Sequence, residues 1–177
     1  MSTNGAISGY EGGLGVYDLV EQGFEQYIKV YNDLGAAVSN GDVYFLDWSK
    51  DADSLSPSAR PTLVACATSA VPRQVVVVNN IIPNNLPVAG SVPTNSSTGI
   101  ADTTWGYVQL RGYCPKIKCA ATIAIDDFLQ GANASQTAAD DGTTQTADSF
   151  AIAVSAVDDP ATGYCAGVMF GTTALIG

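Results

Sequence analysis

Residues 105–119 decide the fold, and they read Trp-Gly-Tyr-Val-Gln-Leu-Arg-Gly-Tyr-Cys-Pro-Lys-Ile-Lys-Cys. Tyr107, Gln109 and Arg111 occupy one parity of this stretch, and two aliphatic residues occupy the other. This period of two is typical of a β-strand with one covered face. Gly112 interrupts the alternation, so we expect a bend or bulge there before the chain resumes an extended course.

Segments of strand-like sequence lie on both sides of this central strand. The four valines within residues 73–79 indicate a strand that is covered on both faces. Residues 17–30 place apolar side chains at helical spacing, but residues 27–31 alternate as a strand does, and we expect β-structure from Phe24 onward. The whole pattern predicts a mainly β fold, a compact barrel-like or sandwich-like domain with long loops and almost no helix. Besides the central strand, the expected strands lie at residues 24–31, 42–48, 62–68, 73–79, 120–125, 149–156 and 165–170.

Three short polar segments predict turns. Residues 32–35 read Asn-Asp-Leu-Gly, and residues 140–142 read Asp-Asp-Gly. Asn and Asp favour turn geometry, and glycine supplies the positive φ angle that many turns need. Residues 40–41 read Asn-Gly, the dipeptide most typical of a β-hairpin, so we expect a hairpin before the strand at residues 42–48.

The amino-acid composition, and the charge in particular, argues against nucleic acid as a partner. The chain has 177 residues, a length typical of one domain, and 46% of them are hydrophobic. Charged residues make up 14%, well below the ~25% of average soluble domains, and the net charge is −10. Binding to nucleic acid needs clustered Lys and Arg, whereas the 7 basic residues are scattered along the chain. We therefore expect no nucleic-acid partner.

The sequence also argues against a membrane partner and for synthesis in the cytoplasm of a host cell. No apolar run approaches the ~18 residues that a membrane-spanning helix needs. Residues 1–15 lack the basic start and the apolar centre of a secretory signal peptide. We then expect Cys66, Cys114, Cys119 and Cys165 to be reduced, buried thiols, with disulfides and a metal site as the alternatives.

Two segments differ from the rest of the predicted domain, which spans residues 17–177. Residues 1–16 contain five glycines and too little apolar surface to order alone, so we expect a flexible N-terminal arm. This arm is either a free tail or a segment that becomes ordered against a neighbouring subunit. Residues 79–104 form an inserted loop that is rich in Asn and carries three prolines. Its apolar residues indicate docking onto a partner or onto its own domain, with disorder as the third alternative.

We expect no catalytic residue, no cofactor and no metal site, and therefore a protein that is not an enzyme. Histidine is absent, which excludes Ser-His and Cys-His nucleophiles. Neighbouring residues of a strand point to opposite faces, so the Asp-Asp pairs form no dyad that shares a proton. Trp48 and Trp105 could stack on a sugar, although aromatic residues of the core or its rim are the simpler interpretation.

Four short segments follow one another in a recognisable order. They are residues 41–46 (Gly-Asp-Val-Tyr-Phe-Leu), 105–112 (Trp-Gly-Tyr-Val-Gln-Leu-Arg-Gly), 127–129 (Asp-Phe-Leu) and 150–156 (Phe-Ala-Ile-Ala-Val-Ser-Ala). This order resembles that of the small capsid decoration (cement) proteins and related head proteins of tailed bacteriophages. The resemblance covers residues 35–170, and the glycine-rich arm and the inserted loop depart from it. It implies a β-rich fold, binding to the outer face of the major capsid protein, and often a homotrimer, with a dimer as the alternative.

These observations lead to one expected function and one alternative. We expect a structural protein on the surface of the virion, which stabilises the shell by bridging subunits of the major capsid protein. The alternative is a carbohydrate-binding or receptor-binding β-module displayed on the virion. The N-terminal arm and the inserted loop are the expected contact elements. The residues expected to bind the partner are Tyr10, Leu14, Ile81, Ile82, Leu86, Val88 and Trp105.

Overall fold

The computed structural model describes residues 6–7, 19–22, 25–47, 61–66, 74–82, 94–95, 98–120, 122–132, 135–157 and 163–170. Strands are the only regular secondary structure in this part of the chain, which confirms the predicted mainly β fold. They are β1 (Ala6–Ile7), β2 (Leu19–Gln22), β3 (Glu25–Asn32), β4 (Val43–Asp47), β5 (Thr62–Val64), β6 (Val75–Val78), β7 (Ile81–Ile82), β8 (Thr94–Asn95), β9 (Thr104–Lys118), β10 (Phe128–Gly131), β11 (Ala138–Gly142), β12 (Ala151–Ala153) and β13 (Tyr164–Met169).

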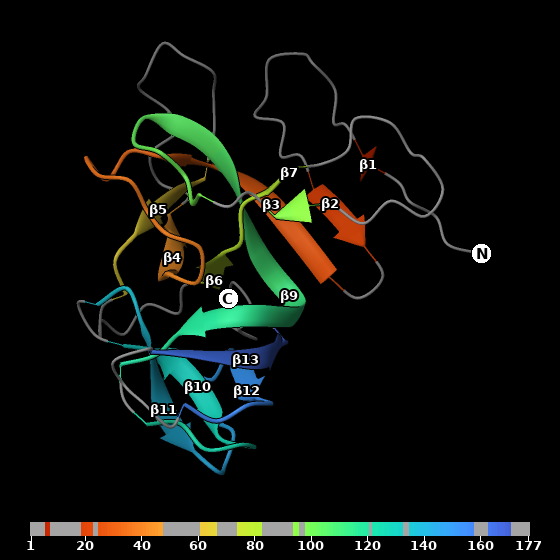
Figure 1. Cartoon of the computed structure of the whole chain (residues 1–177), viewed down its shortest axis with the longest axis vertical. Coiled ribbons are helices and arrows are strands. Elements are labelled where there is room, and N and C mark those ends of the chain that lie inside the picture. Colours follow the sequence, from red (N-terminus) through yellow and green to blue (C-terminus); the bar gives the residue numbers. More distant parts are fainter. Residues whose placement is uncertain are drawn as a thin grey trace.

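Five of these strands close into a β-barrel, which occupies the upper part of Figure 1. Their order is β3-β5-β4-β6-β9, and β9 closes the barrel because it also pairs with β3. β3 and β5 run parallel, whereas all other neighbours in the barrel run antiparallel. Closure satisfies the backbone groups that an open sheet would leave at its edges.

β9 takes part in both halves of the molecule. Its first half pairs with β3 and β6, and its second half, from Gly112 onward, pairs with β13. Gly112 has a φ angle of 91°, which side-chain-bearing residues rarely adopt. The predicted bend is therefore confirmed by the backbone, and Figure 1 shows that β9 turns part-way along its length into the lower sheet. Pro115 lies where the register between β9 and β13 shifts, in keeping with the preference of proline for bulges.

Gln109 is fully buried just before this bend, with 0% of its surface exposed. The alternation of the sequence placed it on the parity opposite to the aliphatic residues, so the prediction of one covered face is wrong at this position. Its Cα is paired with Tyr27 of β3 on one side and with Val77 of β6 on the other. Cross-strand partners share a face, and Val77 belongs to the core that the barrel shares with the second sheet, so the polar parity of β9 is covered as well as the apolar one.

The buried amide of Gln109 makes three hydrogen bonds around the bend. Its Nε2 donates to the carbonyl of Arg111 at 3.0 Å and to the carbonyl of Tyr113 at 2.8 Å. Its Oε1 accepts from Nδ2 of Asn79 at 2.8 Å. Both N–H groups and the oxygen are thereby satisfied, as a buried amide requires. The two carbonyls that Gln109 holds lie on either side of Gly112, so the side chain fixes the geometry of the bend.

The hydrophobic residues form two cores, and β6 contributes to both. Val76 and Val78 lie in the core inside the barrel. Val75 and Val77 point the other way and join the core that the barrel shares with the second sheet. The prediction that residues 73–79 form a strand covered on both faces is therefore confirmed for β6.

The second sheet continues from β9 in the order β13-β12-β10-β11 and forms the lower part of Figure 1. All four of its strand pairings are antiparallel. An isolated bridge between Cys119 and Ala138 brings the chain after β9 next to β11. The inner face of this sheet is buried against the barrel, with Phe150 and Leu129 among its fully buried side chains.

The hairpin predicted at residues 40–41 is wrong, although a turn is present there. The N–H of Asp42 donates to the carbonyl of Ser39 at 3.0 Å, and the glycine of this turn has a φ angle of 97°. The strands on either side do not pair, because β5 lies between β3 and β4 in the barrel. The turn predicted from Asn40-Gly41 is therefore confirmed. The strand that pairs with β4 on this side is not β3 but β5, which follows later in the sequence.

Other local predictions had mixed outcomes. The turn signal at residues 140–142 is confirmed locally, because the N–H of Gly142 donates to Oδ1 of Asp140 at 2.6 Å and Gly142 has a φ angle of 83°, although these residues also end β11, which pairs with β10. The helical alternative for residues 17–30 is wrong over β2 and β3, which pair with each other.

The inserted loop at residues 79–104 contains an antiparallel pair, β7 with β8, and β1 in the arm pairs with β2. The remainder of residues 1–16 lies outside the described residues, so the flexibility of the arm stays a prediction.

Replacing Gln109 by alanine should destabilise the protein by about 2–4 kcal/mol, because the buried amide of Asn79 and the two backbone carbonyls at the bend would lose their partner. Urea denaturation followed by fluorescence measures the free energy of unfolding. Gln130→Ala is the matched control, because the amide of Gln130 makes only a 3.5 Å contact with the carbonyl of Asp140 at the surface. The control should cost less than about 0.5 kcal/mol. Equal costs for the two variants would contradict the role assigned to Gln109.

Candidate binding surfaces

Trp105 is the only residue of the predicted partner-binding set whose side chain is described, and it lies at the start of β9. Its side chain is 40% exposed. The ring packs edge-to-face against Tyr31 of β3, with centroids 5.4 Å apart, and Nζ of Lys29 lies 5.6 Å from its centroid. These contacts hold the indole in one orientation and leave part of it open to solvent.

Trp105 lines a hollow of about 300 Å³ at the point where residues 79–104 leave and rejoin the barrel. Asn80, Thr98 and Thr104 contribute polar atoms to the same hollow. An aromatic wall with a few fixed polar groups is the usual composition of a small-ligand subsite. We call this feature the Trp105 hollow.

Asn80 fixes the shape of the Trp105 hollow through three hydrogen bonds. Its Nδ2 donates to the carbonyl of Gly99 at 2.9 Å, and its Oδ1 accepts from the N–H of Tyr107 at 3.1 Å. Its own N–H donates to Oδ1 of Asn40 at 3.0 Å. One side chain thus ties the beginning of the inserted segment to its end and to β9.

The end of the inserted segment docks onto its own domain. Ile100 is buried in the barrel core, and its side chain fills the space above Gly106. A Cβ at Gly106 would lie 2.4 Å from Cγ1 of Ile100, so only glycine leaves room for this contact. Of the three alternatives for residues 79–104, docking on the same domain therefore holds for this part of the segment.

The other predicted partner-binding residues are less fully placed. Ile81 and Ile82 form β7, which follows Asn80 directly and pairs with β8. The backbone thus brings these two residues close to the Trp105 hollow. Four predicted residues lie outside the described residues, namely Tyr10, Leu14, Leu86 and Val88. Trp48, the other tryptophan of the sugar-stacking hypothesis, also lies outside them.

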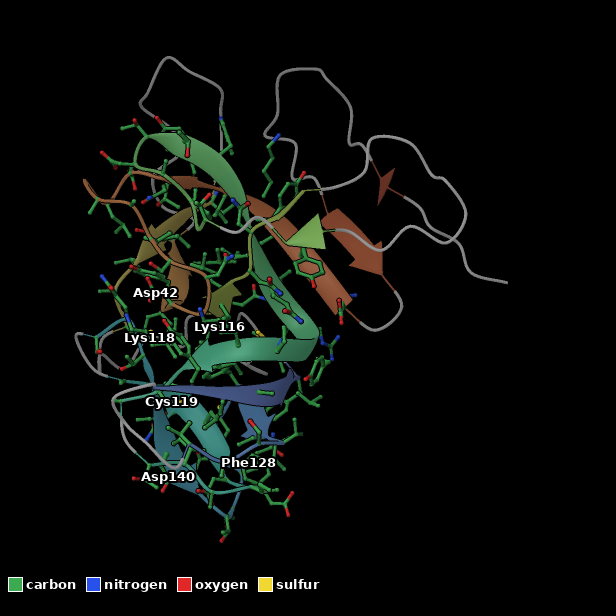
Figure 2. All side chains as sticks on the ribbon, viewed as in Figure 1. Asp42, Lys116, Lys118, Cys119, Phe128 and Asp140 are labelled. Carbon is green, nitrogen blue, oxygen red and sulfur yellow. The ribbon has the colours of Figure 1, made fainter. Side chains whose placement is uncertain are left out.

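A second surface, which the sequence did not single out, covers the outer side of the second sheet. Tyr113 of β9, Val168 of β13, Ile152 of β12 and Phe128 of β10 are consecutive cross-strand partners. Tyr113 is 49% exposed and Val168 39% exposed, and the other two are half-buried. Figure 2 marks the position of Phe128 in this sheet. A row of large apolar side chains therefore crosses four hydrogen-bonded strands.

Two further residues extend this row into a patch, which we call the apolar face. Phe170 follows β13 and packs edge-to-face against Phe128, with ring centroids 6.1 Å apart. Val154 follows β12 and is exposed. The apolar face thus consists of Tyr113, Phe128, Ile152, Val154, Val168 and Phe170, and no described element packs over it.

A sequence signal for the apolar face exists in β13. Its two parities are both mainly apolar, which normally indicates a strand covered on both faces. Cys165 and Met169 on one parity are buried, whereas Val168 on the other is exposed. The strand therefore has the composition of a fully covered strand, although the described part of the chain covers only one of its faces.

β9 carries three basic residues around and after the bend, and Arg111 borders the apolar face because its Nε donates to the carbonyl of Phe170 at 3.2 Å. Nζ of Lys118 forms an ion pair with Oδ1 of Asp42 at 2.9 Å, and Nζ of Lys116 lies 4.1 Å from the ring centroid of Tyr164. Figure 2 shows Asp42, Lys116 and Lys118 close together on neighbouring segments. Arg111 lies on the same strand and is exposed. The fold thus gathers basic residues that also lie close together in the sequence.

The buried carboxylates act within turns. Oδ2 of Asp127 accepts from the N–H of Ala124 at 2.7 Å, and Oδ2 of Asp42 accepts from the N–H of Ser39 at 2.8 Å. Hydrogen bonds of this kind satisfy a carboxylate that is removed from water. Within the described ranges, no three side chains of the metal-ligating types come together.

All four cysteines are buried thiols, as the sequence predicts. Burial raises the pKa of the Cys66 thiol from its ordinary value of 9.0 to about 12, and it raises the pKa of Cys114 equally, to about 12. Both groups remain protonated at neutral pH, because the interior disfavours the thiolate.

Comparison with known proteins adds no relative to these observations. No family model, curated protein or solved structure matches the chain. In the part of the chain that the structure describes, no helix is long and apolar enough to cross a membrane. The two surfaces and the sequence pattern are therefore the features from which a function is inferred.

The raised pKa values of Cys66 and Cys114 predict a loss of stability in alkali. The folded state retains these protons up to about pH 12, whereas the unfolded state releases them near pH 9.0. The stabilisation is therefore complete below pH 9 and falls as the pH rises toward 12. The free energy of unfolding of the wild type should fall more steeply than that of Cys66→Ala/Cys114→Ala, by up to about 2.7 kcal/mol per pH unit, since each of the two thiols contributes about 1.4. Parallel pH profiles for the two proteins, measured by urea denaturation, would contradict this prediction.

Proposed function

We propose that this protein is a structural component of a bacteriophage virion, which binds the outer surface of the capsid and stabilises the shell. The apolar face is the observation that carries the proposal, because it is a rigid surface that the described residues leave uncovered. The order of sequence segments that resembles decoration proteins supports the major capsid protein as the partner. The proposal assigns the protein no catalytic step.

The composition of the apolar face suits protein binding. Buried interface centres are enriched in aromatic residues and arginine, and the face combines Tyr113, two phenylalanines and the neighbouring Arg111. Its strands are joined by hydrogen-bonded ladders, so the side chains lose little freedom when a partner binds. Exposed apolar surfaces of this kind mark interaction sites in many soluble proteins.

The charges around the apolar face indicate which charges the partner surface should carry. The whole chain carries a net charge of −10, whereas the basic Arg111 lies at the border of the apolar face, where its Nε donates to the carbonyl of Phe170. Opposite charges at the rim of an interface increase the rate of association and help to select the partner. We therefore infer an apolar contact surface on the capsid protein with acidic residues at its border.

Bridging two capsid subunits requires a second contact, which we assign to the Trp105 hollow with β7. Trp105 and Tyr113 lie on opposite sides of the bend at Gly112, so the two surfaces face different neighbours. Residues 1–16 would add further contact. Association into a trimer or a dimer would repeat these contacts and raise the avidity for a lattice. The free protein would be made in the host cytoplasm and would end on the capsid surface.

Removing the apolar face should weaken binding to the shell. For Tyr113→Ser/Val168→Ser we expect the number of copies per shell at a fixed protein concentration to fall at least about 10-fold, which corresponds to the loss of one hot-spot residue. Co-sedimentation with empty shells of the cognate phage, followed by quantification of the copy ratio to the major capsid protein, measures this number.

Leu34→Ser is the matched control for this experiment. Leu34 is also an exposed aliphatic residue, but it lies in the turn after β3 on the barrel. The control should bind like the wild type. Full occupancy by the double variant, or an equal loss in the control, would contradict the assignment of the apolar face.

We keep a second candidate function because of the Trp105 hollow. A half-exposed indole beside the side chains of Asn80 and Thr104 resembles the subsites in which proteins stack a sugar ring and bond its hydroxyl groups. On this alternative the protein is a carbohydrate-binding or receptor-binding module that the virion displays.

Trp105→Ala decides between the two candidate functions. If the hollow binds carbohydrate, a glycan array should show binding by the wild type and at least a ~10-fold loss in the variant. Tyr113→Ser serves as the control and should retain the glycan signal. An array on which the wild type binds no glycan contradicts the carbohydrate alternative.

A further inference from the structure

Two of the four thiols lie in direct contact. Sγ of Cys119 is 3.3 Å from Sγ of Cys165, and both side chains are buried. Cys119 follows the end of β9, and its N–H donates to the carbonyl of Gly163. Cys165 lies in β13, two residues after Gly163. The side chains of Cys119 and Cys165 therefore project diagonally toward each other on the inner face of the sheet.

The other two thiols contact backbone carbonyls alone, whereas Cys119, which also donates to the carbonyl of Ile117 at 3.3 Å, lies against a second sulfur. Sγ of Cys66 donates to the carbonyl of Val43 at 3.8 Å, and Sγ of Cys114 donates to the carbonyl of Lys116 at 3.4 Å. Neither is paired with a second sulfur. The geometry therefore selects one pair among the six combinations that four cysteines allow.

We propose that Cys119 and Cys165 are a cross-linking site, at which oxidation of the folded protein forms an internal disulfide. The two sulfur atoms need to approach from 3.3 Å to a bond length of about 2.05 Å, a movement that side-chain rotation in the folded sheet provides. The inference does not depend on the proposed capsid partner, because it concerns the interior of the chain.

A peroxide is a suitable oxidant, since it is small enough to reach a buried sulfur when the sheet opens locally. Hydrogen peroxide oxidises the thiolate of Cys119 to a sulfenic acid, and its second oxygen leaves as water once protonated. The thiol of Cys165 then attacks the sulfenic sulfur, and the hydroxyl group leaves as the second water. Two thiols and one peroxide thus give one disulfide and two waters.

The electrostatics of the pair favour Cys119 as the first sulfur to react. When Cys119 loses its proton, the thiol of Cys165 donates a hydrogen bond to the thiolate and lowers the pKa of Cys119. The same interaction, together with burial, raises the pKa of Cys165. Cys119 is therefore the better nucleophile toward the peroxide. Cys165 keeps its proton until the condensation step, which releases it.

The disulfide would join the end of β9 to the start of β13. The two cysteines are 46 positions apart in the sequence, and the enclosed segment includes β10, β11 and β12. Closing this loop restricts the unfolded chain and stabilises the second sheet beneath the apolar face. Oxidation would thus strengthen the sheet without changing its surface.

The experiment compares the reduced protein with protein treated with hydrogen peroxide. We expect the intact mass to fall by two hydrogens, two of the four thiols to be alkylated after denaturation, and a peptide map to link residues 119 and 165. The melting temperature should rise by about 5–10 °C and return to its original value with dithiothreitol. Four alkylated thiols, a link through Cys66 or Cys114, or a sulfinic acid at Cys119 would overturn the proposal.

Variants separate the cross-link from a general effect of oxidation. Cys165→Ser should lose both the mass change and the rise in melting temperature, whereas Cys114→Ser should keep both. If a variant does not fold, the peptide map of the oxidised wild type still decides the question, because it identifies the linked residues directly.

Discussion

The side-chain amide of Gln109 holds the point at which β9 leaves the barrel and enters the second sheet. It lies between β3 and β6, beyond the reach of water, and it bonds to the two carbonyls that flank Gly112. Buried bonds of this kind matter because their loss leaves unsatisfied polar groups in a low-dielectric interior. The bend thus combines a satisfied buried amide with the residue type that tolerates a φ angle of 91°.

This bend decides which surfaces the protein presents. Before it, β9 places Trp105 beside the hollow at the open end of the barrel. After it, β9 places Tyr113 on the outer side of the second sheet. The inner side of that sheet is covered by the barrel, through Val43, Val75 and their neighbours. The outer side is consequently the one left for a partner, and the two candidate surfaces lie on opposite sides of the bend.

Sequence reasoning reached β3, β4, β6, β9 and β13 because their signals are local. The strand expected at residues 120–125 is wrong, since its described residues form only an isolated bridge at Ile123, and β11 was not expected. The valine run at residues 73–79 and the glycine at position 112 act through periodicity and backbone freedom, which no distant partner alters. The hairpin at residues 40–41 failed because strand pairing is not local, and β5 separates the two strands. Gln109 resembled a surface residue because its partners, such as Asn79, are assembled only by the fold. The apolar face was missed for a related reason, since composition cannot show which parity of a strand is covered.

We infer that β9, held by Gln109, joins the barrel and the second sheet into one cooperative unit. Native-state hydrogen exchange of the β9 amides tests it most directly, with Val108 reporting on the barrel core and Ile117 on the second core. The account predicts equal free energies of opening for the two amides and a single calorimetric transition. An opening free energy for Ile117 that is lower than that of Val108 by more than about 1 kcal/mol, with a separate transition, would contradict it.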